Sequence, residues 1–444
     1  MKQLDRNAAF TRRQWLGGAL AAGASAAMPG FPGRAQALSA WPSVARLAAD
    51  YVATRKVANV VALIGWGQQA PSLIASGKLA MGPSAAVSAD SLYRWYSMTK
   101  PITGMAAMIL VDEGKLRLDQ PLAEILPAFR SMQVQKAYDG AITPANLEPA
   151  ARPITIRMLL THTAGLGYQI IQQGPIHQAF MDAGLLAGMA TRLPVGAFVV
   201  QNPVHGLAAF ADTLAKMPLV YQPGTHWSYS AGLDVIGRVI EVVSGRPFDA
   251  FLQERILGPC GMTSTWFQVP RTWAARLTTN YGVLGAFVIP IDMPDTSVFL
   301  DRPPVLLGGG GLVGSPRDYD RFLRMLAGYG QIDGKRVMSE AAVRMGTSNL
   351  MPPTVVASGN GAGASLDLAR YGFGAGGRVG ITGTDAGVYG WAGAAGTVAF
   401  VDMRRGLRGG LFTQYMPDSA YPLREQFIAA VTADALAAAL RPAA

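Results

Sequence analysis

A serine and a lysine three positions apart, Ser97 and Lys100 in the segment SMTKP, form the first pattern in the chain that could do chemistry. Residues at this spacing face the same side of a helical turn, so the lysine side chain can approach the serine hydroxyl. A serine hydroxyl becomes a nucleophile when a neighbouring base takes its proton, and a lysine serves as that base where burial or nearby positive charge favours its neutral form. The same residues also suit a helix N-cap followed by a solvated lysine, and the spacing alone leaves both interpretations open.

Other catalytic patterns are missing from the sequence or poorly placed in it. There is no G-x-S-x-G motif, which argues against an α/β-hydrolase. The string Gly372-x-Gly374-x-x-Gly377 matches a dinucleotide-binding fingerprint, but it lies among late strand-like runs with no helix opening after it. The four histidines do not fall at metal-ligand spacing: His162, His177, His205 and His226. We therefore expect no cofactor and no metal, and a serine that is activated by a group other than histidine.

Ser97 is predicted to lie where a strand gives way to a helix. Residues 92–96 alternate in the manner of a strand, and apolar residues recur at helical spacing from Ile102 onward. Such a junction lets a side chain stand clear of the backbone. Pro101 either opens the regular helix or removes one hydrogen bond from it, and the sequence does not decide between these.

Strand-like runs lie at both ends of the chain, and helical patterns lie between them. The strand-like runs cover residues 57–65, 72–82, 371–376, 386–393, 396–403 and 407–415. The helical patterns cover residues 41–56, 155–163, 205–217, 234–245, 248–257, 315–330 and 423–440. This order predicts an α+β fold, in which one antiparallel sheet is assembled from both termini and flanked by helices, with a largely helical insertion between them.

The amino terminus has the pattern of a twin-arginine export signal. Arg12 and Arg13 precede an aromatic-leucine pair, a weakly apolar Ala/Gly stretch and the small-x-small step Ala35-Gln36-Ala37. The stretch is short and interrupted by prolines, so we expect no stable membrane span. Residues 1–37 are predicted to be a signal peptide that the twin-arginine export machinery recognises, which places the mature protein in the periplasm or outside the cell.

Charge and cysteine content exclude several classes of protein. The formal net charge of +10 falls to +6 without residues 1–37, which hold five basic residues and one acidic residue. The remaining cations are scattered, and Arg317, Arg321 and Arg324 are predicted to lie on a polar helix face, so nucleic acid is not an expected partner. Cys260 is the one cysteine, which rules out an intramolecular disulfide, and we expect it to pack as a small hydrophobic residue.

Five motifs appear in a fixed order along the chain and carry a family resemblance. They are SMTK (97–100), MLLTHTAGL (158–166), PGTHWSYSAGLDVIGRVIE (223–241), GGGGLVGSPRDYDRFLRML (308–326) and GWAGAAGT (390–397). Together they resemble the penicillin-binding-protein-like serine hydrolases, which include class C β-lactamases, D-Ala-D-Ala carboxypeptidases and family VIII carboxylesterases. The resemblance covers residues 45–435 as one hydrolase domain and implies the β-lactamase/penicillin-binding-protein fold.

The resemblance also assigns roles at the site. It makes Ser97 the acyl-accepting nucleophile, Lys100 the adjacent base, and Tyr229 a proton shuttle between them and the leaving group. It forms an oxyanion hole from the backbone N–H groups of Ser97 and Ala394. It assigns substrate binding to two residues of the third motif, Trp391 and Gly393. His162 is expected to brace a helix end rather than to take part in the chemistry.

Two departures from the β-lactamase pattern favour an esterase. Ala231 stands where penicillin-recognising members keep asparagine, and the Lys-Thr-Gly motif is replaced by Trp391-Ala392-Gly393, which resembles the tryptophan-led version of family VIII esterases. We therefore expect an exported serine hydrolase that acts through an acyl-enzyme on a small-molecule ester or amide, most simply a short-chain acyl ester. The alternatives are a D-amino-acid amidase or peptidase, a weak β-lactamase, and a non-catalytic binding protein that keeps the pocket.

Overall fold

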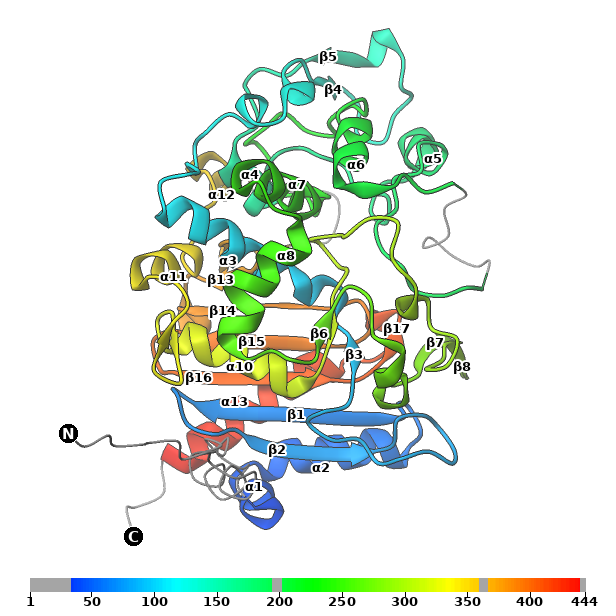
Figure 1. The fold of residues 1–444 in the computed structure, drawn as a ribbon, viewed down its shortest axis with the longest axis vertical. Helices are drawn as coiled ribbons and strands as arrows, with labels where there is room; N and C mark the ends of the chain where they lie inside the picture. The colour runs from blue at the N-terminus through cyan, green and yellow to red at the C-terminus, as the bar shows by residue number, and fades with distance from the viewer. Residues whose placement is uncertain (1–32, 194–201, 359–365, 440–444) are drawn as a thin grey trace, which may run out of the picture. The chain divides into compact units, whose positions relative to one another are not determined.

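The computed structural model describes residues 33–193, 202–358 and 366–439, and within these ranges seven strands form one antiparallel sheet (Figure 1). Its strands, in spatial order, are β12 (Tyr371–Phe373), β13 (Arg378–Gly380), β14 (Val388–Ala392), β15 (Val398–Asp402), β16 (Leu407–Phe412), β1 (Asn59–Trp66) and β2 (Ser72–Gly77). The two ends of the chain meet where β1 pairs with β16, with Val61 opposite Phe412 and Trp66 opposite Leu407. The predicted sheet of both termini is thus confirmed.

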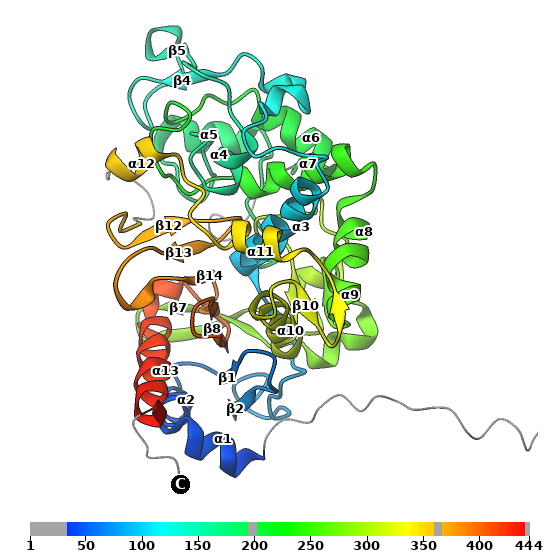
Figure 2. The ribbon, with the colours of Figure 1, turned by 90° about the vertical axis from the view of Figure 1, so that its left-hand side faces the viewer.

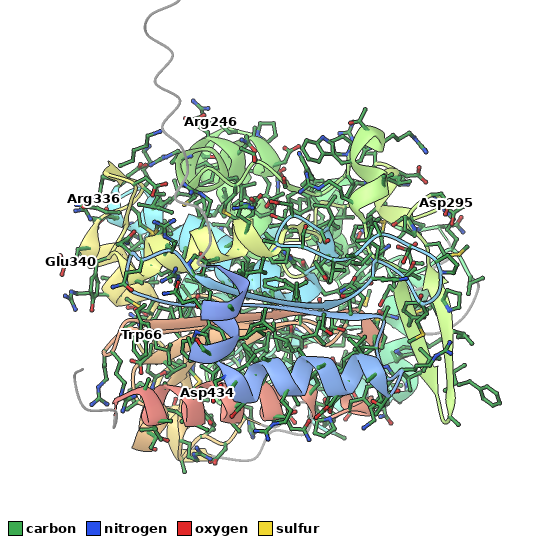
Figure 3. The ribbon with its side chains drawn as sticks, turned by 90° about the horizontal axis from the view of Figure 1, so that it is seen from below. Trp66, Arg246, Asp295, Arg336, Glu340 and Asp434 are labelled. Carbon is green, nitrogen blue, oxygen red and sulfur yellow. The ribbon has the colours of Figure 1, made fainter. Side chains whose placement is uncertain are left out.

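Two helices from opposite ends of the chain cover one face of this sheet (Figures 2 and 3). They are α2 (Pro42–Ala53) and α13 (Leu423–Ala439), and the short α1 (Arg34–Ala40) precedes them. Alternate residues of β1, such as Val60 and Ala62, are buried in the same apolar cluster as Val44 of α2 and Phe427 of α13. The Asp434 carboxylate, labelled in Figure 3, accepts the backbone N–H of Ser43 at 3.0 Å and so caps α2 from α13.

The other face packs against α3 (Thr99–Asp112), α10 (Pro316–Ala327) and α11 (Glu340–Gly346). The Ser315 hydroxyl accepts the Asp318 N–H and so caps α10. Much of the predicted polar face of this helix is buried. Asp320 is buried with Arg408 of β16 at 2.9 Å, and Arg321 and Arg324 are nearly buried and pair with Asp333. The predicted helix is present, and its charged residues pair with Asp333 and Arg408.

As predicted, a largely helical part lies between β2 and β12 in the sequence, and Figure 1 shows it above the continuous sheet. It contains α4 (Ile156–Leu160), α5 (Gly174–Asp182), α6 (Gly206–Leu214), α7 (Gly232–Ser244), α8 (Phe248–Leu252) and α9 (Gly258–Cys260), with a π-helical turn at Gln253–Leu257. Helix α7 packs against α3, α4, α6 and α8, so it forms the centre of this part. Cys260 is fully buried, in agreement with its expected packing role.

Small sheets connect this part to the main sheet, and the sequence did not predict all of them. One joins β3 (Tyr93–Arg94), β9 (Val313–Gly314) and β6 (Thr265–Trp266), and another joins β17 (Tyr415–Met416), β7 (Asn280–Leu284) and β8 (Phe287–Asp292). The remaining short elements are β4 (Gln133–Gln135), β5 (Leu147–Pro149), β10 (Gln331–Ile332), β11 (Lys335–Arg336) and α12 (Pro353–Ser358). The sequence of the β7–β8 hairpin shows no polar-apolar alternation. Its apolar tip is exposed, with Leu284 62% and Phe287 73% exposed.

Most of the predicted signal peptide, residues 1–32, lies outside the described residues, and its last residues form the start of α1. No helix in the described ranges combines the length and the apolar character that crossing a bilayer requires.

Candidate active site

Ser97 lies in a short 3-10 turn, Tyr96–Met98, which joins β3 directly to α3. The backbone of this turn is held on the strand side, where the Trp95 N–H donates to the carbonyl of Leu312 at 3.0 Å. The predicted strand-to-helix junction is therefore present. Pro101 is the third residue of α3, a position whose N–H has no partner within a helix, so the proline costs the helix no hydrogen bond.

Lys100 reaches the Ser97 hydroxyl from the buried side of the turn. Its Nζ lies 3.3 Å from the Ser97 Oγ and also donates to the carbonyl oxygen of Gly309 at 2.6 Å. The Lys100 side chain is fully buried, whereas Ser97 is partly exposed. Solvent and a substrate can thus approach the hydroxyl while the amine stays behind it, which is the arrangement that a serine with a neighbouring base requires.

Tyr229 and Trp391 form an aromatic wall beside this pair. The Lys100 Nζ lies 4.5 Å from the centre of the Tyr229 ring, and the Tyr229 hydroxyl oxygen accepts the indole N–H of Trp391 at 3.2 Å. The two rings are stacked, with centroids 5.7 Å apart. The structure therefore brings together four of the residues that the sequence assigned to the site: Ser97, Lys100, Tyr229 and Trp391.

The loop after β14 lies against the turn that carries Ser97. A Cβ atom at Gly393 would come within 2.3 Å of the Trp95 carbonyl oxygen, so only glycine allows this approach. The Gly393 N–H donates to the Thr397 carbonyl, which closes a tight turn around Ala394. The backbone of Ala394 is thereby placed next to the nucleophile turn, as an oxyanion hole built from Ser97 and Ala394 would need.

His162 lies directly after α4 and behind Tyr229. Its ring is fully buried, with its centroid 4.7 Å from that of Tyr229, and its Nδ1 accepts the Ser230 N–H at 3.2 Å. Burial and the nearby Lys100 cation hold the pKa of His162 well below its usual value, so the ring is neutral. It braces the segment that carries Tyr229, in line with the expectation.

Sequence reasoning missed Asp234, which lies in the first turn of α7 and is fully buried. Its Oδ1 accepts the Gly309 N–H at 2.6 Å. Burial raises the pKa of Asp234 to about 6, although the Lys100 cation and the Gly309 N–H oppose that rise. An aspartate in the first turn of a helix is ordinarily a partner of the helix dipole, so nothing in the sequence connected it with Lys100.

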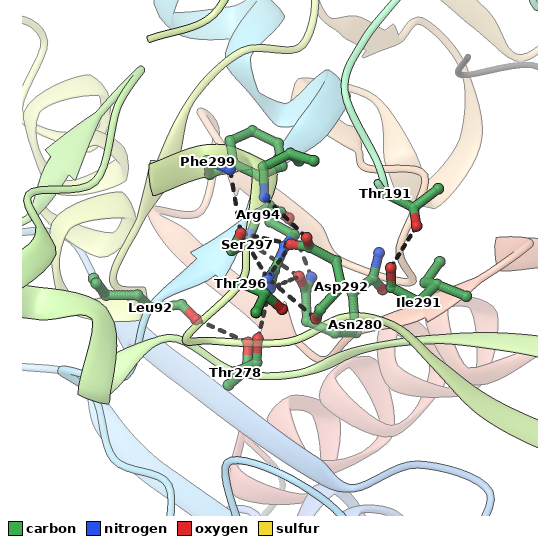
Figure 4. A network of polar contacts seen from close by, with 12 residues as sticks. Leu92, Arg94, Thr191, Thr278, Asn280, Ile291, Asp292, Thr296, Ser297 and Phe299 are labelled. Atoms are coloured by element: carbon green, nitrogen blue, oxygen red, sulfur yellow. Dashed lines mark hydrogen bonds and ion pairs between the residues drawn. The ribbon is translucent and has the colours of Figure 1, made fainter. Parts of the chain in front are cut away.

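A buried polar network fixes the strand that leads to Ser97 (Figure 4). The Arg94 guanidinium is fully buried, forms an ion pair with Asp292 of β8 and donates to the Thr278 carbonyl at 2.6 Å. Ser297 donates to the same Asp292 oxygen at 2.6 Å. The Gln414 amide pairs with both the N–H and the carbonyl of Arg94 at 3.1 Å. Three segments of the chain, at Thr278, Asp292–Ser297 and Gln414, therefore hold Arg94, three residues before the nucleophile.

Replacing Asp292 with alanine should lower the free energy of unfolding by about 3–5 kcal/mol, because the Arg94 charge would stay buried without its partner. Denaturant unfolding measures this change. The matched control is Asp301→Ala, which removes the exposed carboxylate that pairs with Arg192 and Arg271 and should cost about 1 kcal/mol or less. Equal losses for the two variants would show that the buried network contributes no more than a surface pair.

Comparison of the sequence with known proteins gives a matching family model and several similar proteins. Residues 44–433 match the family model described as Beta-lactamase. An uncharacterized protein of Mycobacterium tuberculosis is 40% identical over 257 residues, which are 58% of this chain and 59% of that protein. The lovastatin esterase of Penicillium rubens is 30% identical over 346 residues, which are 72% of this chain and 78% of that enzyme. The chain thus spans less than two thirds of the length of the Mycobacterium relative.

Solved structures share the fold. The hydrolase EstCE1, described as having promiscuous acyltransferase activity, gives a TM-score of 0.70 at 23% sequence identity and covers 89% of this chain and 99% of its own. Unliganded simvastatin synthase from Aspergillus terreus gives a TM-score of 0.69 at 22% identity and covers 88% of this chain and 97% of its own. The expected fold and the resemblance to penicillin-binding-protein-like hydrolases are confirmed.

Proposed function

The chain belongs to the beta-lactamase family of serine hydrolases, and we propose that it is an exported carboxylesterase that cleaves short-chain acyl esters through an acyl-enzyme on Ser97. The observation that carries this proposal is the 3.3 Å approach of the buried Lys100 amine to the Ser97 hydroxyl. The neighbouring Tyr229 supplies a second group that can carry a proton. A protein that only binds its ligand has no use for such a proton relay.

In the first half of the proposed reaction, the Ser97 Oγ attacks the carbonyl carbon of the ester and passes its proton to the Lys100 amine. The carbonyl oxygen becomes an oxyanion, which the N–H groups of Ser97 and Ala394 stabilise; one such donor typically contributes about 3 kcal/mol. The carbon–oxygen bond to the alcohol then breaks. The alcohol takes the proton from Lys100, with the Tyr229 hydroxyl as the carrier, and leaves the acyl group bound to Ser97.

In the second half, water replaces the alcohol. It attacks the acyl carbon while the relay of Lys100 and Tyr229 accepts one of its protons, and that proton returns to the Ser97 oxygen when the acyl bond breaks. The products are the carboxylic acid and the restored serine. The Trp391 N–H on the Tyr229 oxygen stabilises negative charge there while the proton is in transit.

The side chains at the site favour an ester substrate. Trp391 is a large apolar surface, whereas Ala231 and Ala392 offer no side-chain hydrogen bonds for an amide or a carboxylate. The relative named lovastatin esterase supports an ester over an amide. A D-amino-acid amidase, a peptidase and a weak β-lactamase remain the alternatives on the same scaffold.

Export by the twin-arginine route, with the protein in the periplasm or outside the cell, is supported by Arg12-Arg13 and the apolar stretch after them. Fractionation of cells that express the chain, with and without these two arginines, tests this part of the proposal.

Nitrophenyl esters with two to about six acyl carbons should be cleaved roughly 100-fold or more faster than a chromogenic cephalosporin or D-alanyl peptides, because nothing polar at Ala231 or Ala392 orients an amide. Each acyl methylene that the site buries should add about 0.8 kcal/mol of favourable transfer free energy, until the pocket is filled. Values of kcat/KM over this panel provide the measurement. A cephalosporin that equals the best ester would replace the esterase proposal with a β-lactamase.

A further inference from the structure

The Asp234 carboxylate has a feature that its place in α7 does not explain. Its Oδ1 accepts the Gly309 N–H, but its Oδ2 is buried and, among the described residues, has no hydrogen-bond partner. Burying a carboxylate costs free energy unless an opposite charge or hydrogen bonds compensate it. A group that can compensate the charge of Asp234 must therefore lie nearby without touching its Oδ2 atom.

That group is Lys100, on the opposite side of a single glycine. Gly309 donates its N–H to Asp234 and accepts Lys100 on its carbonyl oxygen, both at 2.6 Å. A Cβ atom at Gly309 would lie 2.8 and 2.9 Å from the two Asp234 oxygens, so a side chain there would displace the carboxylate. Gly309 therefore lies between the Asp234 carboxylate and the Lys100 amine.

Other titratable groups around Asp234 are neutral. Tyr168 faces it from the segment after α4, and burial together with Asp234 and Tyr229 holds the pKa of Tyr168 well above its usual value. His162 faces Lys100 and is neutral because its pKa is lowered. The side chains of α6 and α8 that pack on α7 are apolar, such as Leu207 and Phe248. Within the described residues around this point, Lys100 and Asp234 are thus the two groups that can carry charge.

We propose that Asp234 is a positioning residue for Lys100: it orients Gly309, whose carbonyl holds the amine, and its charge stabilises the ammonium that forms when Ser97 gives up its proton. This inference rests on the proposed acyl-enzyme mechanism. No bond to Asp234 forms or breaks, and the proton moves only from the Ser97 oxygen to the Lys100 nitrogen. An anion placed close to a developing cation in a buried site lowers the energy of that step without contacting the substrate.

The test is Asp234→Asn, which keeps the shape and the acceptor for the Gly309 N–H but removes the charge. The maximal rate constant kcat for the best ester should fall roughly 10- to 100-fold, while KM changes less than about twofold, because the substrate does not touch this residue. The acid limb of the pH–rate profile should also move to lower pH, since the ammonium form of Lys100, which cannot take the serine proton, loses the anion that stabilises it.

The matched control is Thr103→Val, which removes the 2.7 Å hydrogen bond from Thr103 to the Gly308 carbonyl and so loosens the same loop without changing its charge. It should lower stability and leave the shape of the pH profile unchanged. If both variants alter the pH profile equally, the role of Asp234 is structural and the proposal is overturned.

A second measurement uses the unaltered protein, in case Asp234→Asn does not fold. The rate at which a fluorophosphonate labels Ser97 should fall through a transition near pH 6 as the carboxylate takes up a proton. A flat labelling rate between pH 5 and 8 would overturn the proposal for Asp234 alone. Loss of labelling at Ser97 at every pH would instead contradict the acyl-enzyme mechanism, so the two failures are distinguishable.

Discussion

Replacing Ser97 with alanine should lower kcat for the best ester by roughly 10⁴-fold or more, because an enzyme that loses its nucleophile keeps only what binding and the oxyanion hole supply. The same change should abolish labelling by a fluorophosphonate, which adds one group to the unaltered chain. Intact-mass measurement counts the label, and peptide mapping should place it on Ser97.

The control for this variant is Ser228→Ala, a buried serine whose hydroxyl has no hydrogen-bond partner among the described residues. It should keep both turnover and labelling. A label that maps to another residue, or that persists in Ser97→Ala, would contradict the assignment of the nucleophile. An active protein that takes no label would exclude the acyl-enzyme altogether, and a protein with neither activity nor label would favour the binding-protein alternative.

Removing either member of the proton relay should lower kcat by roughly two to four orders of magnitude while the protein stays folded. Tyr229→Phe deletes one oxygen and keeps the ring that faces Lys100 and stacks on Trp391, so it tests the hydroxyl alone. Lys100→Met removes the amine and keeps most of the buried volume, which limits the loss of stability. Steady-state kinetics and thermal unfolding of each variant provide the two measurements.

The double variant separates a relay from two independent contributions. If Lys100 and Tyr229 act on the same proton, the losses overlap, and the double variant should be little slower than the slower single variant. Losses that multiply would show that the two side chains contribute separately. Near-normal turnover in Tyr229→Phe would remove Tyr229 from the mechanism, and the proton would then have to pass from Lys100 directly to the leaving alcohol.

Features that depend on local sequence could be predicted for this protein. The junction at Ser97 follows from alternation up to Tyr96 and helical spacing from Ile102, and both signals lie within a few residues of the nucleophile. Six of the seven strands of the main sheet overlap the predicted strand-like runs, whereas the short β13 (Arg378–Gly380) was not predicted. The family motifs then brought Tyr229 and Trp391 to the same site, where the structure also places them.

Features that depend on contacts between distant segments could not be predicted. The role proposed for Asp234 depends on Lys100, which belongs to another helix. The buried Arg94 depends on its ion pair with Asp292, which lies on a hairpin without polar-apolar alternation in its sequence. The arginines of α10 were predicted to lie on a polar helix face, but the sequence did not show what that face packs against. Here it is covered by Asp333 and by the sheet residue Arg408 with its neighbours.

The pairing of β1 with β16 determines when this protein can fold. β1 leaves the ribosome early, but its neighbour begins at Leu407, so synthesis at 5–20 residues per second leaves β1 without this partner for roughly half a minute. Contacts between residues so far apart in sequence also form slowly, because a long loop must close first. In the sheet, β15 and β16 lie between β14 and β1. The strand β14, which carries Trp391, is therefore joined to β1 only when both of those strands are in place. A nascent chain therefore cannot complete this sheet before residues Leu407–Phe412 have been made.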